Sequence, residues 1–254
     1  MIFISLLCAL GGATIAFVFT WGLSRGRAAQ ESHKSAPALT YVGSTTLSMF
    51  VLVMGFLVAS AWQEHNATRD HTYGEARGLT VTYAAAEEFP PSDRTAIRSA
   101  LREYAQDVVT VEWPLLARQQ SSQAAWLAID RGRVAVDQAS THRVDSQTVQ
   151  AELADALEST YQMRSLRLSD MRWAVPEPLL YALVATALLV LLYPALVGIN
   201  AGPRHLLLMV LLGAVLGFGI YIVLEMQHPF GGPISVDPTA YRQALLRFDQ
   251  LDQE

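Results

Sequence analysis

Residues 39–62 read LTYVGSTTLSMFVLVMGFLVASAW and carry no charged side chain over 24 positions. A helix needs roughly 20 predominantly apolar residues to cross the hydrocarbon core of a bilayer. Because lipid supplies no hydrogen bonds, every backbone polar group must also pair inside the segment. Residues 39–62 are therefore predicted to form a transmembrane helix.

Three further runs have the same character. Residues 2–23, 178–203 and 206–224 are uncharged over 22, 26 and 19 positions. The chain is therefore predicted to be an all-α integral membrane protein with four transmembrane helices in two hairpins. Its predicted divisions are a first hairpin over 1–63, a helical water-exposed domain over 64–177, a second hairpin over 178–225, and a turn with a C-terminal amphipathic helix over 226–254.

Charge is concentrated between the two hairpins. Residues 64–177 hold 12 of the 18 basic and 17 of the 23 acidic residues, which keeps this segment in water. Lys34 is the only lysine, and arginine suits bidentate contacts with carboxylates. A network of Arg–carboxylate pairs and a simple solvated helical surface are both compatible with this pattern. The net charge of −5 argues against nucleic acid as a partner.

The middle segment shows helical periodicity throughout. The second span is expected to continue to Glu88 and to stop at Phe89-Pro90-Pro91. Ser92 is then expected to cap a helix. That helix would bury Ile97, Leu101, Tyr104, Val108, Val111 and Leu115, with a kink or an end at Pro114. Further helices are predicted over 123–138, where Trp126, Ile129 and Val136 would be buried, and over 147–172, giving an antiparallel bundle.

Basic residues indicate an orientation. Arg25, Arg27 and Lys34 follow the first apolar run, whereas a signal peptide carries its charge before a shorter core, so a retained first span is expected. With Arg204 these residues place the short loops in the cytoplasm and residues 64–177 on the extracytoplasmic side. Several arginines near span ends on the other face oppose that assignment: Arg69, Arg77, Arg164, Arg167, Arg172 and Arg242.

The spans contain no ionisable residue in their interiors, which argues against a proton relay, an ion-coupled transporter and a voltage sensor. One face of the second span combines hydroxyls, small residues and an aromatic ring. Such a face can line a neutral pore with a hydrophobic constriction or pack against another helix. The pore-lining candidates are Thr45, Ser48, Leu52, Gly55, Phe56 and Ala59. In the fourth span, Gly213 and Gly217 have a spacing that permits close helix packing.

A Pro- and Gly-rich tract follows the fourth span. Prolines fix φ and glycines allow positive φ, so the chain can reverse sharply and insert Phe230 into the helical domain. Asp237 is expected to cap a helix whose first residue is Pro238, and which docks on the 64–88 helix through one apolar face. A structural role and a gating or interface role are both assigned to this tract as hypotheses. Its residues are Pro229, Phe230, Gly231, Gly232, Pro233 and Asp237.

No pattern indicates catalysis. The six histidines are dispersed without i, i+4 pairing, and neither a phosphate-binding loop nor a nucleophile elbow is present. His65 and His71 flank Arg69 and Asp70, where a metal or proton site and ordinary solvated histidines are the two interpretations. No catalytic residue, metal site or cofactor is expected. Cys8 is the only cysteine, so no intrachain disulfide forms.

Several short motifs together resemble the bacterial bestrophin-like membrane proteins. They are Ala61-Trp62-Gln63-Glu64 with Arg69, Glu75-Ala76 and Thr80, then Glu103-Tyr104 and Glu112-Trp113-Pro114, and finally His228-Pro229-Phe230-Gly231-Gly232-Pro233-Ile234-Ser235-Val236-Asp237-Pro238. The resemblance runs from about residue 40 to residue 246. It implies similarity to bestrophins, which are oligomeric, mainly anion-conducting channels with four spans and a pore lined by the second span.

Two features of the animal and bacterial bestrophins disagree with what the residues of this chain indicate. Asp237, Asp249 and Asp252 are scattered after the Pro-Phe tract, so the acidic calcium clasp of the animal channels is not implied here. Bestrophin topology also places the helical domain in the cytosol, whereas the basic loops of this chain place it outside.

Two functions follow as alternatives. The first is an anion channel in the bacterial inner membrane, formed by a homo-oligomer whose second span lines a pore for small inorganic anions. The second is a non-conducting scaffold or sensor whose helical domain binds a partner or ligand. In both cases the lipid bilayer is the solvent for the apolar runs.

Overall fold

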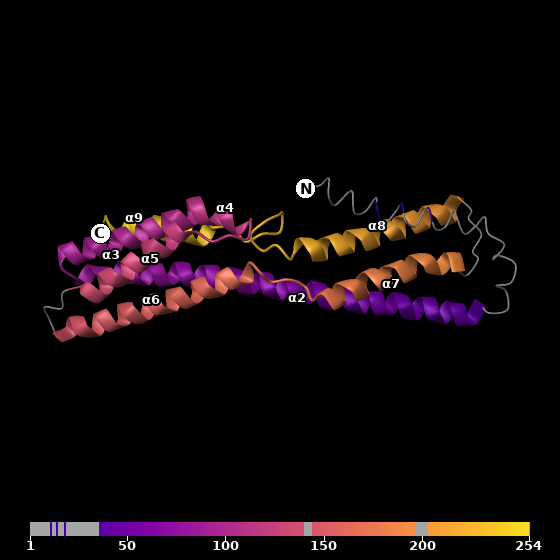
Figure 1. Ribbon diagram of the computed structural model, residues 1–254, viewed down its shortest axis with the longest axis horizontal. Coiled ribbons are helices and arrows are strands. Elements are labelled where there is room, and N and C mark those ends of the chain that lie inside the picture. Colours follow the sequence, from indigo (N-terminus) through magenta and orange to yellow (C-terminus); the bar gives the residue numbers. More distant parts are fainter. Residues whose placement is uncertain are drawn as a thin grey trace. The chain divides into compact units, whose positions relative to one another are not determined.

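The computed structural model describes residues 36–139, 144–196 and 203–253, together with Gly11, Thr14 and Val18. The first predicted span, residues 2–23, and Cys8 therefore fall outside the described residues, apart from these three positions. Every regular element in the described ranges is helical, which confirms the all-α prediction (Figure 1). The elements are α2 (Ala36–Ala85), η3 (Ala86–Glu88), α3 (Pro91–Asp107), η4 (Val108–Glu112), α4 (Trp113–Leu116), α5 (Gln123–Gln138), α6 (Val144–Asp170), α7 (Glu177–Leu196), α8 (Pro203–Glu225) and α9 (Thr239–Leu251).

The chain forms two compact units. Unit 1 comprises residues 1–63 and 174–227, and unit 2 comprises residues 64–173 and 228–254. Helix α2 belongs to both, because it runs on without interruption past residue 63 until η3 and Phe89 end it. The two consecutive prolines that follow explain the stop, since the residue before a proline disfavours helical geometry.

The apolar helices of the described chain lie wholly or partly in unit 1. Two of them, Tyr41–Glu88 and Leu206–Glu225, are long and apolar enough to cross a membrane, and Glu177–Tyr193 is a shorter apolar helix. Only 11% of the most apolar part of the first and 17% of the second is buried. A core helix of a soluble protein would be mostly covered, so these surfaces need another apolar environment.

Unit 2 is a helical bundle in which α3 packs against α5 and α9, and α5 packs against α6. Its core contains Ile97, Leu101, Tyr104 and Val108, all fully buried. The α5 prediction is confirmed at both ends, with Ser122 as the residue that accepts a hydrogen bond from the Ala125 amide. Ile129 and Val136 are buried there as expected, and Trp126 is half-buried. The turn expected after α5 lies mostly in residues 140–143, outside the described ranges.

Two details at the start and end of α3 differ from expectation. Ser92 does not cap this helix, because α3 already begins at Pro91 and Pro90 takes the cap position; proline suits the first helical turn, where its missing N–H is not needed. At the other end, η4 is a π-helical turn, which adds a residue to the turn. The inward face therefore rotates, so that Val111 is exposed and Glu112 is fully buried.

The Pro- and Gly-rich tract makes the expected sharp reversal. Phe230 is 5% exposed and meets the Trp113 ring edge-on, with 5.5 Å between ring centroids. The Val236 amide donates to the Pro229 carbonyl at 2.8 Å and closes the loop. Of the two glycines, Gly232 adopts positive φ, at 87°. Gly231 does not, so only one position needs glycine for its conformation.

Helix α9 starts later than predicted. The Asp237 carboxylate accepts a hydrogen bond from the Thr239 amide at 2.9 Å, but the helix begins at Thr239 and Pro238 holds the cap position. The helix packs chiefly on α3 and reaches the end of α2 through Tyr83, whose ring stacks on Phe248 at 3.9 Å. It was expected to dock on α2; α3 supplies most of its contacts instead.

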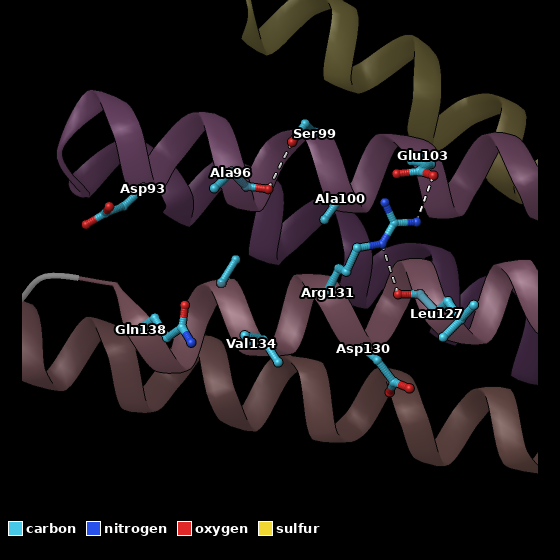
Figure 2. A pocket seen from close by; sticks show the side chains of 11 residues that line it. Asp93, Ala96, Ser99, Ala100, Glu103, Leu127, Asp130, Arg131, Val134 and Gln138 are labelled. Atoms are coloured by element: carbon cyan, nitrogen blue, oxygen red, sulfur yellow. Dashed lines mark hydrogen bonds and ion pairs between the residues drawn. The ribbon is translucent and has the colours of Figure 1, made fainter.

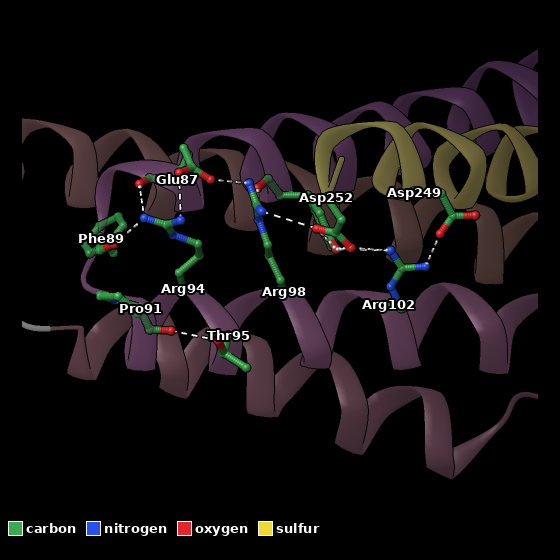
Figure 3. A network of polar contacts seen from close by, with 10 residues as sticks. Glu87, Phe89, Pro91, Arg94, Thr95, Arg98, Arg102, Asp249 and Asp252 are labelled. Atoms are coloured by element: carbon green, nitrogen blue, oxygen red, sulfur yellow. Dashed lines mark hydrogen bonds and ion pairs between the residues drawn. The ribbon is translucent and has the colours of Figure 1, made fainter. Parts of the chain in front are cut away.

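A row of arginines on α3 holds α9 in place (Figure 3). Arg102 pairs with Asp249 at 2.6 Å and with Asp252 at 2.8 Å. Arg98 joins Asp252 to Glu87 of η3, at 3.2 and 3.0 Å. These pairs are partly exposed, so each stabilises the fold modestly, and together they fix the orientation of α9.

Candidate functional site

The six pore-lining candidates all lie on α2 within unit 1. Thr45, Ser48, Leu52, Gly55, Phe56 and Ala59 are all exposed in the single chain. Leu52 is 68% exposed and Phe56 is 61% exposed. The exposed face is broader than this set, because Val42, Met49 and Val51 also belong to it. Exposure alone therefore does not separate pore lining from contact with lipid or with another chain.

The opposite face of α2 packs on the other helices of unit 1. Phe50, Leu57 and Ala61 are buried. A side chain at Gly43 would collide with the Tyr193 ring of α7, and one at Gly219 of α8 would lie 2.7 Å from the Met54 methyl. Small residues thus let the helices approach closely. Gly213 is buried and Gly217 is half-buried on α8, and Gly219 makes the close approach to α2.

The hydroxyl groups on the exposed face differ in what they offer to a passing ion. Thr45 donates its hydroxyl hydrogen to the Tyr41 carbonyl at 2.9 Å, one helical turn back. Ser44 and Thr46 make similar bonds to the backbone. The Thr45 donor is therefore used within the helix, so at this position the face offers acceptor lone pairs and a methyl group, beside the apolar side chains of Leu52 and Phe56.

Unit 2 contains a second candidate site, a buried charged cluster formed by Glu75, Tyr104, Glu112, Arg164 and Arg167. Three of these residues lie in the motifs of the family resemblance, but the sequence did not predict that the five form one site. The five side chains come from α2, α3, η4 and α6, and all five residues are 0% exposed. Two carboxylates and two guanidinium groups balance in charge. Buried charges persist in this way only when they are paired and hydrogen-bonded.

The hydrogen bonds connect all five residues of the cluster. Arg164 binds both Glu112 oxygens at 2.7 and 2.8 Å and reaches the Tyr104 hydroxyl at 2.7 Å. Arg167 bridges the two acids, with Nε 2.8 Å from Glu75 and Nη2 3.0 Å from Glu112. The Tyr104 hydroxyl donates to Glu75. Each carboxylate is therefore held by more than one donor.

Aromatic rings surround the two guanidinium groups. Arg164 lies 4.4 Å from the Trp126 ring centroid, and Arg167 lies 5.6 Å from Trp113 and 5.5 Å from Tyr241. Cation–π contacts of this kind are stronger where water is excluded. The cluster therefore connects α2, α3, η4 and α6 to α5 and α9 through one set of contacts.

The electrostatics of the cluster keep Glu112 ionised. Burial by itself raises the pKa of Glu112, but Arg167 and Arg164 outweigh that effect, so the pKa of Glu112 is lowered. Burial, together with the charge of Glu75, raises the pKa of Tyr104 well above its ordinary value. Tyr104 therefore stays a neutral hydrogen-bond donor, and the chemistry of this site is structural recognition of charge.

A sequence signal for this cluster existed in the spacing. On α6 one helical stripe is buried, formed by Leu153, Leu157, Thr160, Arg164, Arg167 and Asp170. On α2 the buried stripe Thr68, Thr72, Glu75 and Leu79 is similar. The arginines occupy core positions of an otherwise apolar pattern. The Arg–carboxylate network considered from composition is present, and here it lies within one chain.

Of the two histidines that flank Arg69 and Asp70, His71 pairs with an acid at the end of another helix. His71 Nδ1 lies 2.9 Å from an Asp170 oxygen, which joins α2 to the end of α6. Within residues 36–139, 144–196 and 203–253, no group of three or more His, Cys, Asp or Glu side chains is arranged to hold a metal ion.

Taken together, the described residues define an all-helical protein in which two helices are apolar enough to cross a membrane and a helical unit has a buried charged centre. The family model of the bestrophin-like domain matches residues 12–241. The chain therefore belongs to the bestrophin-like family, as its motifs indicated. No curated protein and no solved structure matches it at a significant level.

Proposed function

We propose that this protein is a homo-oligomeric anion channel with four spans per subunit, in which α2 lines the pore. The observation that carries the proposal is the uncovered polar and small-residue face of α2, opposite the face that packs on α7 and α8. Membership of the bestrophin-like family supports the same function. The hydroxyl oxygens of Thr45 and Ser48 can bind water, which suits an aqueous path.

The hydrophobic part of this face supplies the constriction. Leu52 and Phe56 lie one turn apart on it, and a ring of such side chains around an axis would close the path by excluding water. Small residues at Gly55 and Ala59 leave the space beside the constriction open. No calcium requirement is part of this proposal, because the acidic clasp of animal bestrophins has no counterpart in the sequence.

A thiol-modification experiment tests the pore. With Cys8→Ala as the background, Leu52→Cys and Val51→Cys place thiols on neighbouring residues that are both exposed in the single chain. A negatively charged, membrane-impermeant thiol reagent is expected to block chloride flux from liposomes for Leu52→Cys and to leave Val51→Cys conducting. Val51 points about 100° away around the helix, so it is a matched control.

The alternative function has its own outcome in the same assay. A non-conducting scaffold or sensor would give no chloride, nitrate or iodide flux from any variant, although the protein is incorporated and folded. Flux blocked at neither position would remove α2 as the pore-lining helix and leave the channel to another element.

We further propose that the protein resides in the bacterial inner membrane, with residues 64–177 on the extracytoplasmic side. The basic residues Arg25, Arg27, Lys34 and Arg204 support this orientation, because short loops rich in arginine and lysine stay in the cytoplasm.

A further inference from the structure

Unit 2 has an open groove between α3 and α5 that no residue of the described chain fills (Figure 2). Its volume is about 610 Å³, room for several apolar side chains. Small residues form its floor, among them Ala96, Ala100 and Ala135. Leu127 and Val134 of α5 line it and are 56% and 50% exposed. Such a floor between two helices resembles the holes that receive side chains from a third helix.

The rim of this groove carries more acids than bases. Asp93 and Glu103 come from α3, whereas Arg131 is the only basic residue among those that line it. Asp130 of α5 also belongs to the lining, but its carboxylate points toward α6 and accepts a hydrogen bond from Tyr161. Arg131 pairs with Glu103 at 2.7 Å across one end of the groove, as Figure 2 shows. This pair is largely exposed, so little energy opposes its rearrangement. The groove therefore favours an apolar helix face that carries positive charge.

Helix α9 presents such a face. Its inner side is covered through Tyr241, Ala244 and Phe248, and its outer side carries Leu246, which is 63% exposed. Arg242 lies one turn before Leu246 on the same side of the helix, and Arg247 follows it. The nearest acid, Asp249, is already paired with Arg102. The outer face of α9 is therefore apolar at its centre and basic around it.

The same chain cannot bring these two surfaces together, because α5 and α9 pack on different sides of α3 (Figure 2). A second copy can, since each unit 2 carries the groove on one side and the α9 face on the other. A contact between unlike surfaces is heterologous, and repeating it around an axis closes a ring. Helix-in-groove contacts with an apolar anchor and a charged border are a common form of recognition.

We propose that the outer face of α9 docks into the α3/α5 groove of a neighbouring subunit, with Leu246 seated over the alanine floor and its arginines facing the acidic rim. This contact rests on the proposed homo-oligomer and specifies which surfaces build it. It joins subunits through unit 2 and uses no residue of the exposed face of α2 in unit 1.

Disulfide crosslinking tests the contact in the full-length protein reconstituted in lipid. In the Cys8→Ala background, one chain carries Val134→Cys and another Leu246→Cys. Co-expressed, they are expected to give a crosslinked dimer on mild oxidation, and a chain carrying both substitutions is expected to give a ladder of higher species. Each single variant alone is expected to stay uncrosslinked. A dimer from Leu246→Cys alone, or none from the mixture, would overturn the proposed pairing.

A charge inserted at the centre of the contact gives a second readout. Leu246→Asp is expected to weaken association roughly tenfold or more, because a leucine that the contact buries is replaced by a carboxylate that faces the acids of the groove. Leu166→Asp, at an exposed position of α6, is the matched control and is expected to leave assembly unchanged. Circular dichroism and melting of both variants establish that unit 2 is folded. Full assembly of folded Leu246→Asp would contradict the proposal.

The outcomes separate this contact from the proposed function. Wild-type protein that is monomeric in lipid at all concentrations would remove both the oligomeric channel and the contact. Wild-type protein that assembles and conducts, but shows no crosslink between positions 134 and 246, would remove the contact alone.

Discussion

The buried charged cluster shows at the scale of single residues how a helical unit can depend on ions in its core. Glu75 and Glu112 are each held by guanidinium groups with no exposure to water. Taking ions out of water is unfavourable, and their mutual attraction compensates only when the hydrogen bonds are well made. Removing one partner of a buried ion pair should therefore lower the free energy of unfolding more than replacing both partners with apolar residues.

Arg167→Met is expected to lower the free energy of unfolding by about 3–5 kcal/mol, because Glu75 is left buried without its cation. Denaturant unfolding of the full-length protein in detergent measures this. Combining Arg167→Met with Glu75→Leu should recover much of the loss, since no unpaired charge remains. Arg131→Met removes an exposed ion pair and should change the midpoint little. Equal losses for the single and double variants would contradict this account.

Acid should destabilise the protein through Glu112. Its pKa is lowered in the folded state from the ordinary 4.5, so its contribution is complete above about pH 4.5 and is lost as the pH falls through the folded-state pKa. Glu112→Gln cannot bind this proton. The stability difference between wild type and Glu112→Gln should therefore shrink as the pH falls below 4.5, as thermal melts over a pH series would show. A stability difference that stays constant below pH 4.5 would contradict this account.

At the scale of elements, breaks in regular geometry position the site residues. The π-helical turn η4 rotates the chain so that Glu112 enters the core and Val111 leaves it. The reversal at 229–236 packs Phe230 against Trp113 and leads to the start of α9. Helix periodicity does not predict the π-helical turn, because that turn depends on what the neighbouring helices offer. The reversal and the burial of Phe230 follow from the prolines and glycines of the tract, whereas Trp113 as the partner of Phe230 does not.

The two adjacent glycines of the reversal should respond differently to substitution. Gly232→Ala is expected to destabilise unit 2 by about 1–2 kcal/mol, because φ is 87° there and a Cβ is strained in that region. Gly231→Ala should change stability by less than about 0.5 kcal/mol, since its Cβ would meet only Ala117 at an ordinary 3.8 Å. Melting of both variants in detergent compares them, and a larger loss at Gly231 would show that packing, and not backbone strain, limits this turn.

At the scale of the whole molecule, thiol labelling tests on which side of the membrane unit 2 lies. Leu166→Cys in the Cys8→Ala background places a thiol on an exposed position of unit 2 that lies outside the proposed subunit contact. A membrane-impermeant maleimide is expected to label it in intact cells, because the basic loops favour an extracytoplasmic unit 2. Ser24→Cys, in a predicted cytoplasmic loop, should be labelled only after lysis. The reverse pattern would establish the cytosolic placement that similarity to bestrophins implies.

Local sequence patterns were sufficient to predict the helices and the family. Uncharged runs, helical periodicity, the double proline at 90–91 and the Pro-Phe-Gly-Gly-Pro tract each act through neighbouring residues, so they can be read in order along the chain. The bounds of α5, the end of α2 and the burial of Phe230 followed from them. The six candidates on α2 were placed on one face by spacing alone, and their role in conduction stays a prediction.

By itself the amino-acid sequence determined an all-helical chain of the bestrophin-like family, with uncharged runs suited to lipid and a charged middle suited to water. Only the tertiary structure decided which charges are buried: Arg164 and Arg167 meet Glu75 and Glu112 because helices distant in sequence come together. It also decided the start of α9, the rotation at η4 and the acidic groove between α3 and α5. Helical periodicity shows which side of a helix faces inward, whereas the ion pairs depend on which residues of other helices face that side.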